Sequence, residues 1–391
     1  MLELRERDFR SFFEAPEHAY GADSPFVSVF DEDLKRFLDA RKNPLLRRFG
    51  ALTYFSALRD GRPVGRITAH AHDASNKRHG WNRGSFGYFD CADDPEAAQR
   101  LLGAAEQWAR ARGHDEIWGN FNLTAMAPAG VVTDGYEHPP YSDQLWNPPH
   151  IPRLLEAAGY TREFPMTQFE VDLNQMEPDS VLRPEHRKLL SDPALEWGRV
   201  RVRGLSKLLP EICDAFNDGF DQNPMFVPLT HQEFQFVARD LTWVIDSRIS
   251  SVVRERGQVV GILLCIPDLN PLLRTCRSRM GPLTLPRLLL YRRRCRRAVV
   301  IIQGVRRRLQ NRGLGAVMIH QVLAALKDAG YEQLGITWIA DVNVASLRGA
   351  VRGGGRPLHR LHLYRKALPA CHRWCFASDG HEPRRPAGAA G

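Results

Sequence analysis

The sequence predicts a mixed α/β fold that occurs twice along the chain, and three observations lead to this prediction. The order of hairpin, strand, helix and strand in the first half returns in the second half. The helix-to-strand passages align, LLGAAEQWARARGHDEIW in one half with HQVLAALKDAGYEQLGITW in the other. Both halves also end alike, in LLEAAGYTREFPMTQFEVDL and in LRGAVRGGGRPLHRLHLYRKAL. Such internal repetition favours two copies of one fold, with two unrelated α/β domains as the alternative.

The elements of the first half follow from hydrophobic spacing and from turn residues. Residues 32–43 have the spacing of a helix. Residues 51–71 are predicted to form a hairpin with Asp60 and Gly61 at its turn, because an Asp-Gly pair between apolar runs suits a tight hairpin turn. The next elements are a strand at 85–91, a helix at 93–113 that opens with acids and a proline, and a strand at 116–122.

The second half repeats this order. Its hairpin at 249–270 turns at Arg256 and Gly257. A strand at 298–305, a helix at 315–330 and a strand at 334–340 follow. The predicted organisation is a first domain at 1–175, a linker at 176–199, a second domain at 200–368 and a flexible tail at 369–391, which is too poor in apolar residues to pack.

Length and charge limit the classes of function. The 391 residues suggest two or three domains, and a hydrophobic content of 43% is enough for real cores. The formal net charge of +9 favours a polyanionic partner, which leaves nucleic acid, an anionic membrane surface and a phosphorylated cofactor open.

Targeting signals and cysteine usage indicate a reduced, cytoplasmic setting. No stretch reaches the roughly 18 uninterrupted apolar residues of a membrane span, and the first ten residues have no apolar signal-peptide core. The cysteines are scattered, which fits free thiols better than a disulfide framework. The segment CHRWC matches no common zinc spacing, so we expect no metal site.

A basic, glycine-punctuated turn, within Val305 to Met318, joins the strand at 298–305 to the helix at 315–330. Such a turn leaves backbone N–H groups exposed at the positive end of the helix dipole, which is an arrangement that holds phosphate. Gly313 and Gly315 let an anion approach the backbone closely. Charge around it would come from four arginines: Arg306, Arg307, Arg308 and Arg312. An ordinary glycine-bearing turn with a solvated basic face is the alternative.

The order Gln310-Asn311-Arg312-Gly313-Leu314-Gly315 resembles the Q/R-x-x-G-x-G/A pyrophosphate signature of the GCN5-related N-acetyltransferase (GNAT) superfamily. The resemblance covers residues 200–368. In the first half it is architectural, because FDCADDPEAAQ stands where the phosphate loop would be and its paired aspartates would repel pyrophosphate. The resemblance therefore implies two tandem GNAT-like acyltransferase folds, of which the first is degenerate.

By this resemblance, acyl-CoA is the co-substrate and lies along residues 305–316. The implied coenzyme-binding residues are Gly304, Val305, Gln310, Asn311, Arg312, Gly313, Leu314, Gly315, Ala316 and Asn343. The thioester carbonyl would lie beside 302–305, where a backbone N–H stabilises the developing oxyanion. The acyl group would pass directly to an acceptor amine.

A base is needed to deprotonate this amine, and the superfamily's commonest position for it is empty here, because the strand at 298–305 carries no acid. Asp341, at the end of the strand at 334–340, is the candidate, and capping of the following helix is its alternative role. The superfamily's usual tyrosine acid is missing, with Ala350 in the expected place. Tyr364 is expected to pack in the sheet.

Residues 267–298 form an insertion that mixes leucines with many arginines. The apolar content favours peripheral contact with an anionic membrane over nucleic acid, because Tyr291 is the only aromatic residue available to stack on bases. The predicted contacts are Leu288, Leu289 and Leu290 with five arginines: Arg292, Arg293, Arg294, Arg296 and Arg297. An exposed basic face, or contact with the coenzyme's phosphates, is the alternative.

A narrower resemblance rests on GRPVGRI, FGYFD, PDLN and QNRGLG, and points to a bacterial group related to N-acyl amino acid synthases and bacterial ceramide synthases. It implies a long-chain or lipid-like substrate and an acceptor pocket with Asn223, Phe226 and Thr230, for which simple packing is the alternative. The predicted function is acyl-CoA-dependent N-acyl transfer. An aminoacyl-tRNA-dependent transferase and a non-catalytic coenzyme A or lipid sensor remain alternatives.

Overall fold

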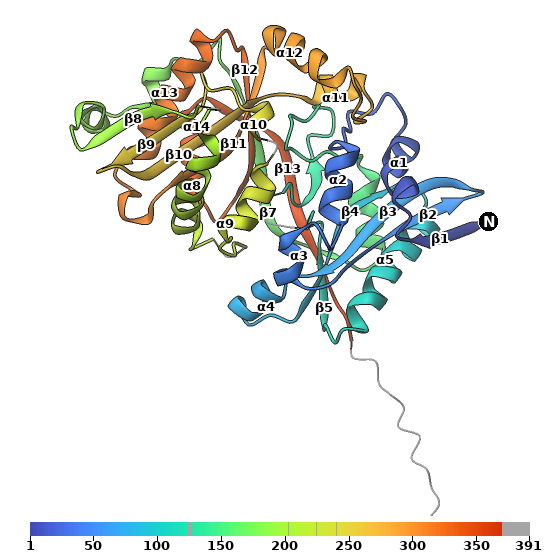
Figure 1. The fold of residues 1–391 in the computed structure, drawn as a ribbon. Helices are drawn as coiled ribbons and strands as arrows, with labels where there is room; N and C mark the ends of the chain where they lie inside the picture. The colour runs from blue at the N-terminus through green and yellow to red at the C-terminus, as the bar shows by residue number, and fades with distance from the viewer. Residues whose placement is uncertain (124–126, 202, 224, 240, 370–391) are drawn as a thin grey trace, which may run out of the picture.

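The computed structural model describes residues 1–123, 127–201, 203–223, 225–239 and 241–369 (Figure 1). The first half holds β1 (Leu2–Glu6), α1 (Phe9–Tyr20), α2 (Asp31–Leu38), α3 (Pro44–Phe49), β2 (Leu52–Arg59), β3 (Arg62–Ala71), α4 (Asp73–His79), β4 (Arg83–Cys91), α5 (Pro95–Arg110), β5 (Glu116–Gly119), β6 (Val131–Asp134), α6 (His150–Ala157) and β7 (Thr161–Asp172). The connecting stretch holds η1 (Pro178–Val181), α7 (Pro184–Arg187) and η2 (Lys188–Ser191).

The second half repeats the pattern with one insertion. It holds β8 (Leu195–Arg199), α8 (Leu205–Phe220), α9 (His231–Ala238), α10 (Leu241–Val244), β9 (Ser251–Glu255), β10 (Gln258–Pro267), α11 (Asn270–Thr275), α12 (Thr284–Arg294), β11 (Arg297–Val305), η3 (Arg307–Leu309), α13 (Leu314–Asp328), β12 (Gln333–Ala340), α14 (Val344–Arg352) and β13 (Gly355–Ala367). Helices α11 and α12 form the insertion between β10 and β11. The predicted mixed α/β class is confirmed.

Turn and cap residues produce the local structure where the sequence predicted it. Asp60 and Gly61 have φ angles of 50° and 80°, and Arg256 and Gly257 have 51° and 76°, so both hairpins turn through left-handed backbone. Asp94 caps α5, since its carboxylate accepts a hydrogen bond from the Ala97 N–H at 3.1 Å. These elements therefore begin and end for local chemical reasons.

The two halves share one sheet because they exchange their last strands. The strand order is β1-β2-β3-β4-β5-β13-β7-β12-β11-β10-β9-β8, and β6 pairs with β13 at the side. Strand β7 of the first half pairs with β12, while β13 of the second half pairs with β5. The two exchanged strands pair with each other, antiparallel, at the centre (Figure 1). Each half thus completes its sheet with a strand from the other half.

Apolar cores lie on both sides of this sheet. Helix α5 covers β2 to β4 of the first half through Leu101 and Leu102, which are buried. Helix α13 covers β10 and β11 of the second half through Val322 and Leu326. Helix α8 packs on β10 and β11, and α9 packs on α8, through another cluster that includes Phe216. Strand β11 therefore lies between α8 and α13, whereas α14 packs on β12.

The stretch predicted as a linker, residues 176–199, contains η1, α7, η2 and also β8, the strand at the edge of the sheet. It lies against α13, where Asp179 accepts from His320 Nε2 at 2.9 Å and the Met176 carbonyl accepts from Lys327 at 2.7 Å. The domain boundaries themselves remain a prediction. The predicted tail, with Cys371, His372 and Cys375, falls outside the described residues apart from residue 369.

Cysteines in the described residues are free: Cys91, Cys213, Cys265, Cys276 and Cys295. Within the described part of the chain, no helix combines the length and the apolar character that a bilayer crossing needs.

Candidate active site

Strands β11 and β12 run parallel and separate halfway along their length. Their pairing extends from Arg297 opposite Gln333 to Val300 opposite Ile336. The next residue, Ile301, is a bulge, because Val300 pairs with Cys265 and Ile302 pairs with the adjacent Leu264. Beyond this point, among the described residues, β11 pairs with β10 and not with β12. The split leaves one edge of residues 302–305 without a neighbouring strand in the part of the chain that the structure describes.

The turn after β11 has the backbone that an anion-binding loop needs. Asn311 and Gly313 have φ angles of 60° and 86°. Helix α13 then begins at Leu314 with no side-chain cap on its first N–H groups. A Cβ atom at Gly315 would meet its nearest heavy atom, the Gln303 amide nitrogen, at 3.5 Å, so the backbone there is open to contact. The N-terminal N–H groups and the helix dipole together favour an anion.

Side chains from α8 hold this turn in place. Asp218 accepts a hydrogen bond from the Arg307 N–H at 2.7 Å. The Gln310 amide donates to the carbonyls of Gly219 and Val305, at 3.0 and 2.9 Å. The first residue of the predicted signature, Gln310, therefore anchors the turn rather than pointing out from it.

Three of the four arginines predicted to supply charge are used in protein contacts. Arg306 donates from Nε to the Val259 carbonyl at 2.7 Å, and Arg308 pairs with Glu255. The guanidinium of Arg307 faces the side-chain oxygen of Gln222 at 2.6 Å when that amide is oriented to accept. Arg312 is exposed and has no polar partner among the described residues. It is the arginine of this group that is available to an incoming anion.

His186, in α7, was missed by the sequence analysis. A Cβ atom at Gly313 would lie 2.3 Å from the His186 ring, so the imidazole packs directly on the turn. Its ring nitrogen accepts weakly from the Arg183 N–H at 3.4 Å. No local pattern marks His186, because its place depends on how the connecting stretch packs along α13.

In the first half, the place that corresponds to the split between β11 and β12 is filled by another segment of the chain. Strands β4 and β5 pair only from Arg83 to Ser85, and β4 then bulges at Tyr88 and Phe89. Segment 120–122 follows β5 and closes the split. Buried Asn122 accepts from the Tyr88 N–H at 2.8 Å, and buried Asn120 accepts from the Phe89 N–H at 3.2 Å. These contacts occupy the edge of β4 that corresponds to 302–305 of β11.

The segment is also too close to β4 for anything to lie between them. The Phe121 N–H donates to the Phe86 carbonyl at 2.7 Å. A Cβ atom at Gly87 would lie only 2.0 Å from the Phe121 carbonyl oxygen. In the loop before α5, Asp94 is bound by Arg59 at 2.7 Å as well as capping the helix. Among the described residues of the first half, the split between β4 and β5 is therefore closed, and Asp94 occupies the start of the helix that follows.

Asp341, the candidate base, lies directly after β12 in a two-bonded ion pair with Arg360 of β13. The carboxylate oxygens are 2.8 and 2.6 Å from the two guanidinium nitrogens. Arg360 also donates to the Thr167 hydroxyl of β7 at 2.7 Å. The side chain does not cap α14, because Asn343 accepts the Ser346 N–H there at 3.1 Å.

The residues predicted for the acceptor pocket make local contacts. Asn223 accepts from the Met225 N–H at 2.9 Å in the turn after α8. Phe226 is buried and packs at 5.2 Å from the Phe216 ring. Thr230 caps α9 in a reciprocal arrangement with Glu233. These contacts agree with the packing alternative, and a substrate role for the three residues stays a prediction.

Two further expectations concern tyrosine chemistry. Tyr364 is fully buried in β13, and its hydroxyl donates to Glu156 at 2.9 Å and accepts from Arg162 at 3.1 Å. Its predicted place in the sheet is confirmed. Ala350 is buried within α14.

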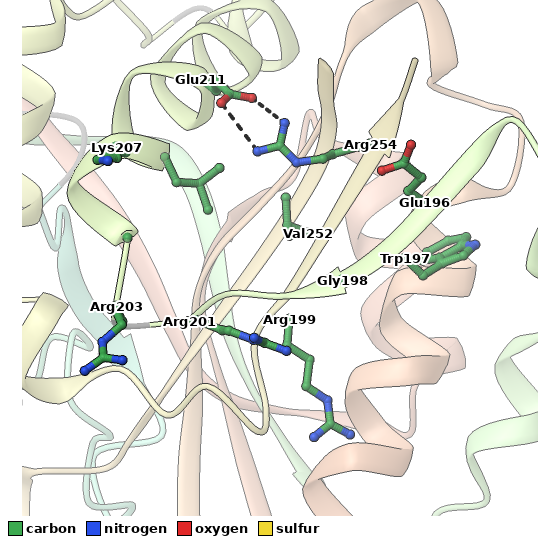
Figure 2. A pocket seen from close by; sticks show the side chains of 12 residues that line it. Glu196, Trp197, Gly198, Arg199, Arg201, Arg203, Lys207, Glu211, Val252 and Arg254 are labelled. Atoms are coloured by element: carbon green, nitrogen blue, oxygen red, sulfur yellow. Dashed lines mark hydrogen bonds and ion pairs between the residues drawn. The ribbon is translucent and has the colours of Figure 1, made fainter. Parts of the chain in front are cut away.

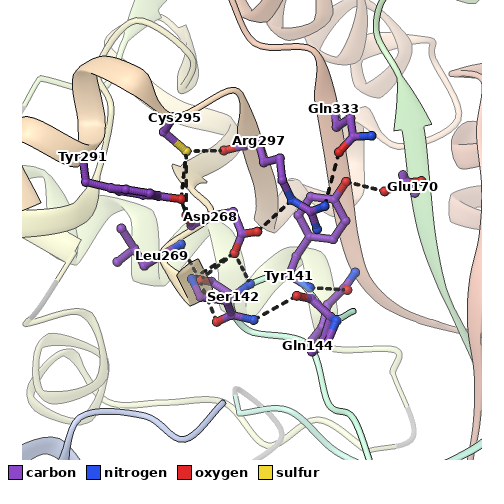
Figure 3. Close-up of polar contacts among 12 residues, drawn as sticks. Tyr141, Ser142, Gln144, Glu170, Asp268, Leu269, Tyr291, Cys295, Arg297 and Gln333 are labelled. Carbon is purple, nitrogen blue, oxygen red and sulfur yellow. Dashed lines mark hydrogen bonds and ion pairs between the residues drawn. The ribbon is translucent and has the colours of Figure 1, made fainter. Parts of the chain in front are cut away.

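A loop of the first half, which includes Tyr141 and Gln144, packs against β11 and β12 (Figure 3). The Tyr141 ring lies over Gly335 of β12, where a Cβ atom would approach to 2.5 Å. Gln144 donates to the carbonyl of Ile336, the last residue of β12 that pairs with β11, at 2.9 Å. Arg297 lies over the Tyr141 ring at 3.9 Å and pairs with buried Asp268 at 3.0 Å. The network fixes the base of the split to both halves.

A basic pocket of about 380 Å³ lies elsewhere, between β8, β9 and the start of α8 (Figure 2). Its lining includes Arg199, Arg201, Arg203 and Lys207, while Arg254 is paired with Glu211 at 2.6 Å. None of the residues predicted to bind the coenzyme lines this pocket.

The sequence has whole-length relatives of known name, although no family profile matches the chain. It is 25% identical over 368 residues to the bacterial ceramide synthase of Caulobacter vibrioides, covering 92% of this chain and 95% of the relative. It is 26% identical over 374 residues to the protein YghO of Escherichia coli, covering 93% and 94%.

Solved structures share the fold over the same length. A tandem GNAT protein from the clavulanic acid biosynthesis pathway superposes with a TM-score of 0.56 at 13% identity, covering 94% of this chain and 99% of that one. A GCN5-related N-acetyltransferase from Sphaerobacter thermophilus gives a TM-score of 0.51 at 14% identity, covering 94% and 96%. The chain therefore has the tandem fold of GCN5-related N-acetyltransferases. The two relatives confirm the predicted resemblance to the group that includes the bacterial ceramide synthase.

Proposed function

We propose that the protein transfers an acyl group from a coenzyme A thioester to the nitrogen of an acceptor amine, and that only the second half binds the coenzyme. The observation that carries this proposal is the contrast between the two splits. In the second half β11 leaves β12 after Val300 and leads into a turn with uncapped N–H groups. In the first half Asn120 and Asn122 close the corresponding edge.

The proposed chemistry follows from this placement. The acyl chain and its thioester lie along 302–305, and the pyrophosphate lies on the backbone of 311–315 with Arg312 beside it. The amine attacks the thioester carbonyl, a backbone N–H of β11 stabilises the oxyanion, and the C–S bond breaks. The amine proton passes to Asp341 or to water, and the coenzyme leaves as a thiolate that is then protonated.

For the substrate we propose a long-chain or lipid-like molecule. The support is the likeness over nearly the whole chain to a protein named bacterial ceramide synthase. Asn223, Phe226 and Thr230 lie in the segment between α8 and α9, which we propose as the acceptor side. A coenzyme A or lipid sensor without turnover is the second candidate, because both oxygens of Asp341 are already bound by Arg360.

The coenzyme site is tested at Gly315, since the structure leaves room there for a side chain. Gly315→Glu places a negative charge among the N–H groups at the start of α13, whereas Gly315→Gln adds nearly the same volume without charge. Calorimetric titration with coenzyme A should show binding that is lost or at least about tenfold weaker in the glutamate variant than in the glutamine variant. Equal binding by both variants and the parent protein would overturn the proposed site.

A further inference from the structure

We propose that the outer face of α12, together with Trp243 of α10, is a docking surface for an anionic lipid bilayer. The docking surface consists of six residues: Trp243, Leu285, Leu289, Leu290, Arg293 and Arg294. This inference does not depend on the proposed acyl transfer, because it rests on exposure and charge outside the split between β11 and β12.

The apolar members of the docking surface are more exposed than large side chains usually are. The exposed fractions are 60% for Trp243, 48% for Leu285, 56% for Leu289 and 63% for Leu290. Leu288 and Tyr291, on the opposite face of α12, pack against Leu269 and Leu272. An apolar cluster on an outer face, next to a face that is already buried, marks an interaction site.

The chain segment that carries α12 has only positive charges. Residues 269–298 contain nine arginines and no aspartate or glutamate. Arg293 and Arg294 are exposed and have no polar partner among the described residues. They lie four residues after Leu289 and Leu290, so each arginine shares a helix face with a leucine. Side-by-side leucines and unpaired arginines match the boundary between acyl chains and anionic headgroups.

Several residues of the predicted membrane segment make contacts within the protein and are therefore not available to contact a bilayer. Three of the five predicted arginines are engaged: Arg292 donates to the Ile245 carbonyl at 2.8 Å, Arg296 to the Gly330 carbonyl at 2.9 Å, and Arg297 to Asp268 at 3.0 Å. Leu288 is buried at 9% exposure. Trp243 joins the surface instead, because Arg292 also binds its carbonyl at 3.3 Å and so fixes α10 beside α12.

Hydrogen bonds hold the docking surface in a fixed position relative to the rest of the fold. The Tyr291 hydroxyl donates to the Asp268 carbonyl at 2.6 Å, and Asp268 is held by Ser142 and Arg297 (Figure 3). The Asp31 N–H donates to the Ser278 carbonyl at 2.9 Å, which fixes the loop before α12 to the first half. Figure 1 shows α12 on the rim of the molecule. A rigid surface loses little conformational entropy when it binds.

The test is co-sedimentation of the full chain with vesicles of phosphatidylcholine, with and without phosphatidylglycerol. We expect binding to the anionic vesicles that weakens as salt rises. Arg293→Gln combined with Arg294→Gln should weaken this binding roughly 30-fold, because each arginine acts close to the anionic surface. Leu289→Ser combined with Leu290→Ser should weaken it at least about tenfold through lost apolar insertion.

The matched control is Arg199→Gln combined with Arg201→Gln, which removes the same charge from exposed positions at the β8 end of the sheet and should leave binding nearly unchanged. Equal binding to neutral and anionic vesicles, no binding at low salt, or an equal loss in the control would each overturn the proposal. So would a dimer, seen by sedimentation velocity, that the leucine substitutions dissociate, because the surface would then join two copies of the chain.

Discussion

Asp341 and Arg360 join the end of β12 to β13 through two hydrogen bonds of 2.8 and 2.6 Å. The pair connects the candidate base, at the end of β12, to the strand that crosses into the first half. A carboxylate in this arrangement can serve either as a positioned base or as a structural tie, and each possibility predicts a different pattern of variants.

We expect Asp341→Asn to lower turnover roughly 10²- to 10⁴-fold while coenzyme binding persists, because asparagine keeps the size of the side chain and removes its basicity. Turnover is measured by mass spectrometry of the acylated product. The comparison is Arg360→Gln, which breaks the ion pair and leaves the carboxylate in place. If Arg360→Gln lowers turnover as far as Asp341→Asn does, the pair is a structural tie and another group takes the proton.

The segment that fills the first-half split should contribute to stability and not to coenzyme binding. Asn120→Ala leaves the buried N–H of Phe89 without its partner, and Asn122→Ala does the same to the half-buried N–H of Tyr88, which costs up to about 1–3 kcal/mol in the free energy of unfolding. Urea unfolding measures this cost, with exposed Asn174→Ala as the control. A second coenzyme bound per chain in either variant would show that the first half keeps a latent site.

Stability should fall in mild acid because of two buried histidines on β3 and just after it. Burial holds the pKa of His70 well below its ordinary value and lowers the pKa of His72 to about 4. In the unfolded chain both histidines bind a proton near pH 6.5, whereas the folded protein keeps them neutral to lower pH. The free energy of unfolding therefore has its full value above about pH 6.5 and decreases as the pH falls toward 4. His72 alone accounts for a loss of about 3 kcal/mol in the free energy of unfolding.

Urea unfolding at about pH 7.5 and about pH 5 tests this dependence. His70→Leu combined with His72→Leu should reduce the difference between the two pH values, because leucine does not titrate. Exposed His18→Leu should leave the difference as it is in the parent protein. An unchanged pH dependence in the double variant would assign the acid sensitivity to carboxylates.

The contact between Gly335 and Tyr141 should not tolerate a methyl group. Gly335→Ala places a Cβ atom 2.5 Å from the buried Tyr141 ring, and such overpacking costs about 1–3 kcal/mol of unfolding free energy. The cost should be smaller in a Tyr141→Leu background, as a double-mutant cycle would measure. Gly103→Ala, in the middle of α5 with nothing within 4 Å, should instead stabilise the protein. Equal costs in both backgrounds would contradict the contact.

The sequence by itself determined the features that depend on neighbours along the chain. Asp60 with Gly61 and Arg256 with Gly257 set the two hairpin turns, because their backbones enter the left-handed region where the strands must reverse. The order from Gln310 to Gly315 likewise predicted the turn before α13. These features could be predicted because periodicity, turn residues and caps act within a few residues.

The tertiary structure alone decided which distant groups meet. The exchange of β7 and β13, the closing of the first split by Asn120 and Asn122, and the capture of Asp341 by Arg360 join segments that no local pattern connects. His186 on Gly313 and Trp243 beside α12 are of the same kind. A β-strand edge offers the same N–H and carbonyl groups whatever its sequence, so the packing of the whole chain selects its partner.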